Sequence, residues 1–66
     1  LFDGLTLPDQ FVLQVEAERT GAAAWRSFAD TCSDPEAAEK LRSCAALEEA
    51  NAAALEQIIA SMTAAP

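Results

Sequence analysis

Histidine and tyrosine are absent from this 66-residue sequence, which contains one tryptophan and three phenylalanines. Histidine is the commonest general base and a frequent ligand of transition metals, so any acid–base or metal chemistry must use other side chains. The sequence also has no glycine-rich phosphate loop and no nucleophile beside a base. These absences exclude a catalytic triad and a phosphate-loop nucleotide site.

Basic residues are few: four Lys and Arg stand against eleven Asp and Glu, for a net charge of −7. A phosphate backbone would be repelled by this charge, and no basic stripe reverses it. No apolar run approaches the roughly 20 residues that span a bilayer, the polar faces lack the Lys and Arg of a membrane-surface helix, and no signal peptide is recognisable. We therefore expect no nucleic-acid partner, no membrane association and a cytoplasmic location.

Two cysteines, Cys32 and Cys44, are fewer than the four or more that usually form the disulfide framework of a small secreted domain. If the chain reverses near Ser33, Cys44 lies roughly 14 Å along the second helix while Cys32 stays at the turn. The two sulfurs then cannot pair. We expect reduced thiols that act as small core residues.

A first helix is predicted over residues 7–31. Thr6 can accept hydrogen bonds from the free amides of the first turn, Pro8 tolerates an early helical position, and Asp9 favours the positive helix end. Gly21 interrupts the middle of this segment at a cost of roughly 0.5–1 kcal/mol relative to alanine. We interpret it as a point of close approach for a neighbouring backbone.

A break near residues 31–35 precedes a second predicted helix over residues 35–62, which is rich in good helix formers. Ser33 with Glu36 forms a capping box, and Asp34 followed by Pro35 is an equally good start. In either case a tight turn joins two long helices, which must then lie antiparallel. The whole chain, residues 1–66, is expected to be one domain.

Residues spaced alternately three and four apart predict which faces of the helices meet. On the first helix this seam comprises Phe11, Val15, Glu18, Ala22, Trp25, Ala29 and Cys32, with Phe28 beside it in the core. On the second helix it comprises Leu41, Cys44, Glu48, Asn51, Leu55, Ile58 and Met62. Three polar residues, Glu18, Glu48 and Asn51, therefore occupy positions where a core is expected.

The three polar residues are predicted to meet in one layer. Glu18 lies fifteen residues before Ser33 and Glu48 fifteen after it, while Asn51 is one turn beyond Glu48. A chain this short buries only about 60% of the surface that its unfolded form exposes, so we expect self-association. A two-fold dimer would bring together four carboxylates, which cations, protons or water must compensate. Two divalent ions would balance that charge, and the oxygen ligands suit Mn²⁺, Fe²⁺, Mg²⁺ or Ca²⁺.

Two segments resemble the metal-ligand helices of ferritin-like, rubrerythrin-type proteins. Residues 18–29 (ERTGAAAWRSFA) have a glutamate, an aromatic residue seven positions on and a Phe-Ala pair three beyond it; residues 47–51 (LEEAN) are similar to the family's Glu-x-x-His helix. The resemblance covers about residues 9–62, half of the family's four-helix bundle. It implies a dimer of hairpins, as in the encapsulated ferritins, that holds two iron or manganese ions for ferroxidase, peroxidase or oxygen chemistry.

The resemblance assigns Glu18 and Glu48 as metal ligands and places Asn51 at the histidine position. An asparagine carbonyl is a weaker donor than imidazole, so we expect lower affinity for iron and a preference for harder ions. Trp25 stands where the family has tyrosine and offers no phenol.

The sequence thus predicts an all-α protein, an antiparallel two-helix hairpin that forms a ferritin-like four-helix bundle as a homodimer or higher homo-oligomer. Three interpretations of the Glu18 and Glu48 pair remain open: a site for two divalent ions per dimer, a metal-free polar layer that fixes dimer register, or a solvated face. The first gives a metal-storage or oxidoreductase protein, or a degenerate relative of one. The second gives a structural module with no cofactor. Whether the protein is an enzyme is left open.

Overall fold

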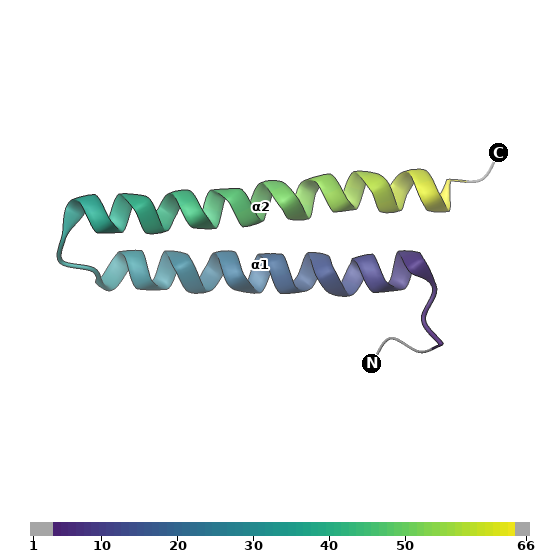
Figure 1. Cartoon of the computed structure of the whole chain (residues 1–66), viewed down its shortest axis with the longest axis horizontal. Helices are drawn as coiled ribbons and strands as arrows, with labels where there is room; N and C mark the ends of the chain where they lie inside the picture. The colour runs from purple at the N-terminus through teal and green to yellow at the C-terminus, as the bar shows by residue number, and fades with distance from the viewer. Residues whose placement is uncertain (1–3, 65–66) are drawn as a thin grey trace.

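The computed structural model describes residues 4–64 as two antiparallel helices, α1 (Leu7–Thr31) and α2 (Pro35–Thr63), shown in Figure 1. The described part of the chain is all-helical, which confirms the hairpin prediction. The first helix has the predicted bounds, and the second ends one residue later than expected. The predicted domain of residues 1–66 extends beyond the described residues at both ends.

Short polar side chains start both helices. The Oγ1 atom of Thr6 accepts a hydrogen bond of 3.2 Å from the backbone N–H of Asp9, as predicted. At α2 the structure selects one of the two predicted starts: Asp34 is the N-cap, and its Oδ1 accepts a 3.2 Å hydrogen bond from the backbone N–H of Glu36. Each cap supplies a partner for an amide that the helix itself leaves unpaired.

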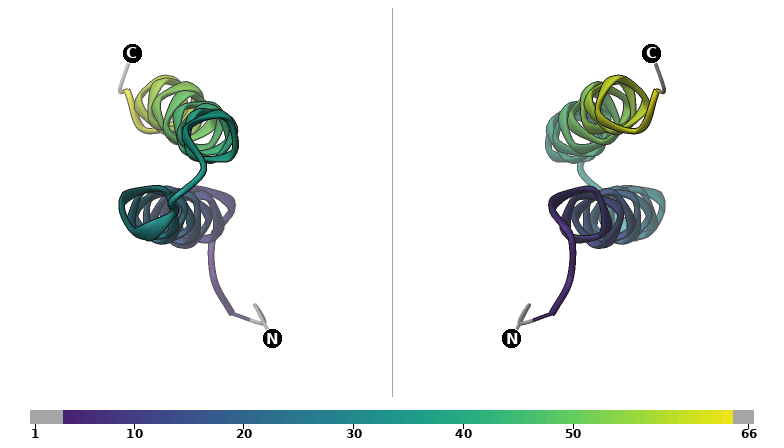
Figure 2. Two further views of the ribbon diagram at one scale, coloured as in Figure 1. Left: turned by 90° about the vertical axis from the view of Figure 1, so that its left-hand side faces the viewer. Right: turned by 90° about the vertical axis from the view of Figure 1, so that its right-hand side faces the viewer.

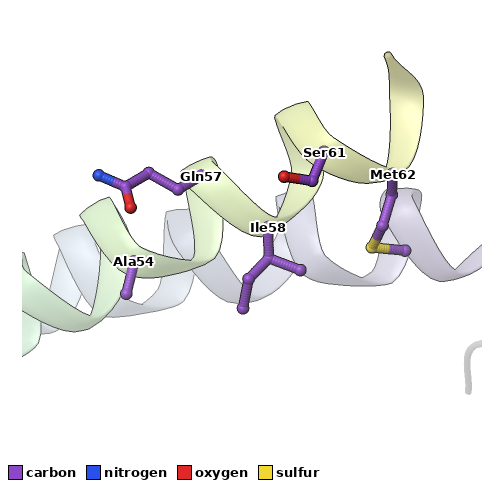
Figure 3. A pocket seen from close by; sticks show the side chains of 5 residues that line it. All are labelled: Ala54, Gln57, Ile58, Ser61 and Met62. Carbon is purple, nitrogen blue, oxygen red and sulfur yellow. The ribbon is translucent and has the colours of Figure 1, made fainter. Parts of the chain in front are cut away.

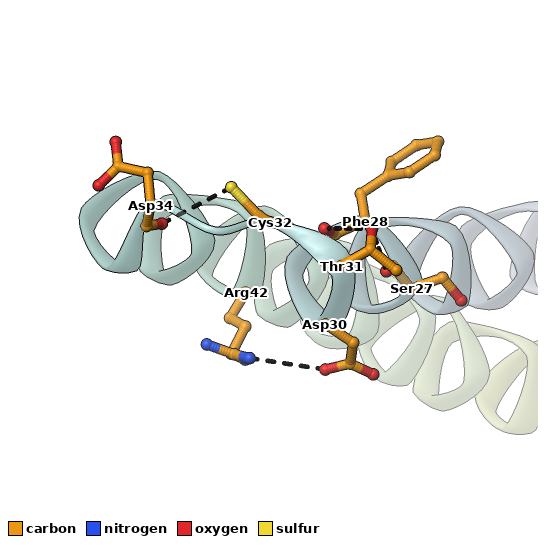
Figure 4. Close-up of polar contacts among 7 residues, drawn as sticks. All are labelled: Ser27, Phe28, Asp30, Thr31, Cys32, Asp34 and Arg42. Atoms are coloured by element: carbon orange, nitrogen blue, oxygen red, sulfur yellow. Dashed lines mark hydrogen bonds and ion pairs between the residues drawn. The ribbon is translucent and has the colours of Figure 1, made fainter.

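Only residues 32–34 separate the two helices, and local hydrogen bonds hold this turn (Figure 4). The backbone N–H of Cys32 donates to the carbonyl of Ala29 at 3.2 Å, and its thiol lies 3.6 Å from the carbonyl oxygen of Asp34. Arg42 and Asp30 then join the two helices just beyond the turn at 3.5 Å. So short a connection fixes the helices as antiparallel neighbours.

Alanine dominates the contact between the helices. The buried hydrophobic residues of the described chain recur every seven positions on each helix; they are Val15, Ala22, Ala29, Ala38, Ala45 and Ala52. Larger side chains between them are half-buried. We call the full set the inner seam: Phe11, Val15, Glu18, Ala22, Trp25 and Ala29 on α1 and Cys32 at its C-cap, with Ala38, Leu41, Ala45, Glu48, Ala52, Leu55 and Ile59 on α2.

The α1 side of the inner seam is the predicted one, and all seven of its residues are buried or half-buried. The α2 side corrects the prediction. Leu41, Glu48 and Leu55 lie in the seam as expected, but the other four predicted members are exposed; these are Cys44, Asn51, Ile58 and Met62. Ala38, Ala45, Ala52 and Ile59 take their place, and the three small alanines allow the two helices to pack closely.

The aromatic residues predicted for the core are only partly covered. Trp25 is half-buried, and Phe28 is 58% exposed. Their rings meet edge to face, with centroids 6.1 Å apart and planes at 73°. Because Phe28 packs against its own helix rather than against α2, the single hairpin leaves most of this ring in water.

The hairpin is a single layer. Its principal extents are 50 × 26 × 11 Å, and the end-on views of Figure 2 show α1 and α2 side by side with neither broad face covered. Within residues 4–64, neither helix contains a stretch that is long and apolar enough to cross a membrane.

Candidate carboxylate site and its two faces

One broad face of the hairpin carries ion pairs between the helices. Arg19 contacts Glu56 and Arg26 contacts Glu49, each with an N–O distance of 2.5 Å. Arg19 and Arg26 are seven residues apart on α1, and Glu49 and Glu56 are seven residues apart on α2. Both ion pairs therefore lie on the same side of the inner seam. We call this side the charged face. The matching seven-residue spacing of the two arginines and of Glu49 and Glu56 is visible in the sequence but was not used in the prediction.

The bridge between Arg26 and Glu49 changes the ionisation of both groups. The hydrogen bond from Arg26, together with its positive charge, lowers the pKa of Glu49 below the usual 4.5. The same hydrogen bond and the charge of Glu49 raise the pKa of Arg26. Both side chains remain about two-fifths exposed, so water and salt screen the pair.

On the opposite side of the inner seam, the positions of the described helices that directly flank the seam carry no charged residue. Positions seven apart on both helices form what we call the uncharged stripe: Gln14, Gly21 and Phe28 on α1, with Ala37, Cys44, Asn51 and Ile58 on α2. The two sides of the inner seam therefore differ in charge, because ion pairs between the described residues join the helices only on the charged face.

An uncharged hollow adjoins this stripe near the end of α2 (Figure 3). It encloses about 540 Å³ and is open to solvent. Ile58 and Met62 project from α2 toward the same side. The residues around the hollow are Ala54, Gln57, Ile58, Ser61 and Met62. Apolar surface thus continues along α2 beyond its midpoint.

Glu48 lies in the inner seam, and its carboxylate reaches across to Gly21. A Cβ atom added to Gly21 would lie 2.9 Å from Glu48 Cδ and 3.0 Å from Glu48 Oε1. The prediction that another backbone approaches Gly21 is therefore wrong, because the close neighbour is the side chain of Glu48. Oε2 of Glu48 is buried and has no hydrogen-bond partner among the described residues.

Glu18 is the second half-buried carboxylate of the inner seam. Its Oε1 accepts a 3.1 Å hydrogen bond from the side-chain amide of Gln14, one turn earlier on α1. Gly21, under the Glu48 carboxylate, is three residues further along the same helix. The hairpin thus brings Glu18 and Glu48 to neighbouring turns at the boundary between the inner seam and the uncharged stripe.

Asn51, the third predicted site residue, is exposed and lies on the uncharged stripe one turn from Glu48. Within residues 4–64 of a single chain, no three His, Cys, Asp or Glu side chains form a group that could hold a metal ion. Cys32 and Cys44 are both free, as predicted, but Cys44 is exposed rather than a core residue. One hairpin therefore places Glu18 and Glu48 on neighbouring turns, and Asn51 lies outside the inner seam.

Comparison of the chain with protein-family models, with curated proteins and with solved structures finds no match.

Proposed function

We propose that two copies of the hairpin pair through their uncharged stripes as a ferritin-like four-helix bundle whose central Glu18 and Glu48 side chains bind divalent cations. The observation that carries this proposal is the buried, unpartnered Oε2 of Glu48. A carboxylate oxygen without a partner is costly to bury, and a cation bound beside it would remove that cost.

The composition of the core supports a second copy. Among the described residues, the buried hydrophobic side chains are Val15 and five alanines, so little apolar area is removed from water within one hairpin. Meanwhile Phe28 and Ile58, both on the uncharged stripe, are 58% and 45% exposed. Pairing through this stripe covers apolar side chains and leaves the ion pairs of the charged face in solvent.

The available donors suit hard divalent ions. Two chains contribute four carboxylates from Glu18 and Glu48, whose charge two divalent ions balance, and Asn51 adds a neutral oxygen at the edge of the site. The orphaned oxygen of Glu48 fits such a role. Glu18 and Glu48 would hold the ions, and iron or manganese held in this way would supply ferroxidase or peroxidase chemistry. Free thiols at Cys32 and Cys44 suit a reducing, cytoplasmic setting.

A second candidate is a metal-free structural module with the same bundle. The hydrogen bond from Gln14 to Glu18 favours it, because that contact satisfies a carboxylate oxygen without any ion. Under this alternative the polar layer fixes the register of the dimer and has no cofactor.

Elemental analysis of the sized protein separates the two candidates. After growth with added iron and manganese, metal binding predicts a dimer peak with about one ion per chain. Glu18→Gln and Glu48→Gln should each lower the metal content, whereas the exposed control Glu39→Gln should not. A metal-free dimer that Glu48→Gln leaves equally or more stable supports the structural module instead. A folded monomer at micromolar concentration contradicts both candidates.

A further inference from the structure

The ion pairs of the charged face stop before the open end of the hairpin, which is the end where both termini lie (Figure 1). The pair nearest this end joins Arg19 to Glu56. Seven residues further from the turn, the two helices carry Val12 and Thr63 in place of charged residues. Among the described residues, no ion pair therefore covers the contact between the helices beyond Arg19 and Glu56.

A hollow of about 420 Å³ lies at this place, with residues of both helices around it. Half of its lining is apolar and half is charged. Val12 is 43% exposed and Ile59 is half-buried, so apolar surface in the hollow remains in contact with water. The residues that line it are Val12, Val15, Glu16, Arg19, Glu56 and Ile59.

The open half of the hairpin is also its acidic half. All four basic residues of the chain lie between positions 19 and 42, where four acidic residues balance them. Residues 4–18 and 43–64 contain no basic residue, and their acidic residues are Asp9, Glu16, Glu18, Glu48, Glu49 and Glu56. Within the described chain, Glu16 is exposed beside the hollow and makes no ion pair. A positively charged partner is therefore attracted to this end.

We propose that the hollow docks a basic amphipathic helix of a partner protein. Such a helix carries apolar side chains three or four residues apart, with Lys or Arg beside them. Its apolar side chains cover Val12 and Ile59, and a neighbouring Lys or Arg pairs with Glu16. A second copy of this chain is a poor occupant, because its net charge of −7 is repelled by the same acidic residues.

This docking surface is separate from the proposed dimer contact. The hollow adjoins Arg19 and Glu56 on the charged face, whereas the dimer is proposed to form through the uncharged stripe. The hollow therefore stays open to a partner in the single hairpin and in the proposed four-helix bundle.

A labelled model peptide tests the docking. The probe is a helical peptide with leucines along one stripe and lysines beside them, and its fluorescence anisotropy is followed as the protein is added at low salt. We expect saturable binding that weakens as salt is added, because salt screens the charges around the hollow. The same peptide with each lysine replaced by glutamate should not bind. Equal binding of the two peptides, or no binding of the basic one, overturns the proposal.

Two neighbouring residues locate the contact. Val12 and Leu13 are 43% and 42% exposed, and only Val12 lines the hollow. Val12→Ser should weaken binding of the basic peptide about three- to tenfold, because it removes apolar surface that the peptide covers. Leu13→Ser should change the affinity by less than about twofold. Circular dichroism checks that both variants keep their helices, and equal weakening by the two overturns the assigned contact.

A charge variant tests the part played by Glu16. Glu16→Gln should weaken binding by up to about fivefold and flatten its salt dependence, whereas Glu39→Gln, in the neutral half of the hairpin, should change neither. An unchanged salt dependence in Glu16→Gln overturns the contact with Glu16. If Val12→Ser converts a dimer into a monomer on a sizing column without peptide, a second copy occupies the hollow and the basic partner is overturned. Loss of peptide binding alone leaves the proposed carboxylate site standing, because the two surfaces are separate.

Discussion

The carboxylate of Glu48 rests on Gly21, the one residue of the two described helices that has no side chain. An added Cβ would lie 2.9 Å from Glu48 Cδ. Glycine in the middle of a long helix weakens it, so Gly21 occupies a position where alanine would otherwise stabilise α1. The site and the stability of the helix therefore have opposite requirements at this residue.

Replacement of Gly21 by alanine should separate these two requirements. The new methyl group meets only the tip of a flexible side chain, which can swing away. We therefore expect the free energy of unfolding to rise by about 0.5–1 kcal/mol at concentrations where the chain is monomeric. Cation content and dimer affinity should fall, because the Glu48 carboxylate leaves its place. Chemical denaturation and elemental analysis measure the two effects.

The matched control for Gly21→Ala is the same change in a Glu48→Ala background. There the helix gain should persist and no further loss of cation should occur. A Gly21→Ala variant that keeps its full metal content would contradict the placement of Glu48 in the site.

Ala52 and Ala53 offer a neighbouring pair for testing the inner seam. Ala52 is fully buried between the helices, whereas Ala53 is exposed. Ala52→Leu should lower the free energy of unfolding by about 1–3 kcal/mol, because the added carbons force the helices apart. Ala53→Leu should change it by less than about 0.5 kcal/mol. Thermal or urea unfolding followed by circular dichroism compares them, and equal effects would refute the assigned seam.

Acid should weaken the hairpin through the bridge between Arg26 and Glu49. The pKa of Glu49 is lowered in the folded chain, so its contribution to stability is present above the usual 4.5 and is lost as pH falls through the folded-state pKa. Glu49→Gln should flatten the pH dependence of unfolding below pH 4.5, and added salt should reduce the difference. The comparison variant is Glu39→Gln, on the exposed surface of α2; a matching loss of pH dependence there would argue against the bridge.

Cys44 should report on the pairing of two hairpins. Its thiol is exposed on the uncharged stripe of the single chain. In a Cys32→Ser variant, labelling of Cys44 by a neutral thiol reagent should be fast at nanomolar protein and slow as the concentration rises. In the reciprocal Cys44→Ser variant, labelling of the half-buried Cys32 at the turn should depend less on concentration. A Cys44 rate that is independent of concentration would mean that the stripe stays uncovered.

The sequence was sufficient to predict both helices and the α1 side of the inner seam. Thr6, Asp34 and Pro35 mark helix starts by chemistry that acts within one turn, and Phe11, Val15 and Trp25 define a single apolar face on α1. On α2 two candidate sets of seam positions share Leu41, Glu48 and Leu55 and differ in the residues between them. Hydrophobicity favoured the set that contains Ile58 and Met62, whereas close packing of the helices selects the set that contains Ala45 and Ala52.

The candidate site was predicted in part for the same reason. Glu18 belongs to the single apolar face of α1 and Glu48 to both patterns on α2, so their partial burial could be predicted before the seam was known. Asn51 belongs only to the α2 pattern that does not pack against α1, and its side chain is exposed. The ion pairs of Arg19 and Arg26 depend on how far α2 is shifted along its axis relative to α1. The residue pattern of one helix alone does not determine that shift.

The three-residue turn between α1 and α2 also has a consequence for the order of folding. Contacts nearest residues 32–34, such as Arg42 with Asp30, close the shortest loops, and later contacts add one turn at a time toward the open end. Low contact order of this kind gives folding in microseconds to milliseconds. If two copies pair as we propose, the hairpin therefore folds first, and the encounter between chains, which depends on concentration, is the slow step of assembly.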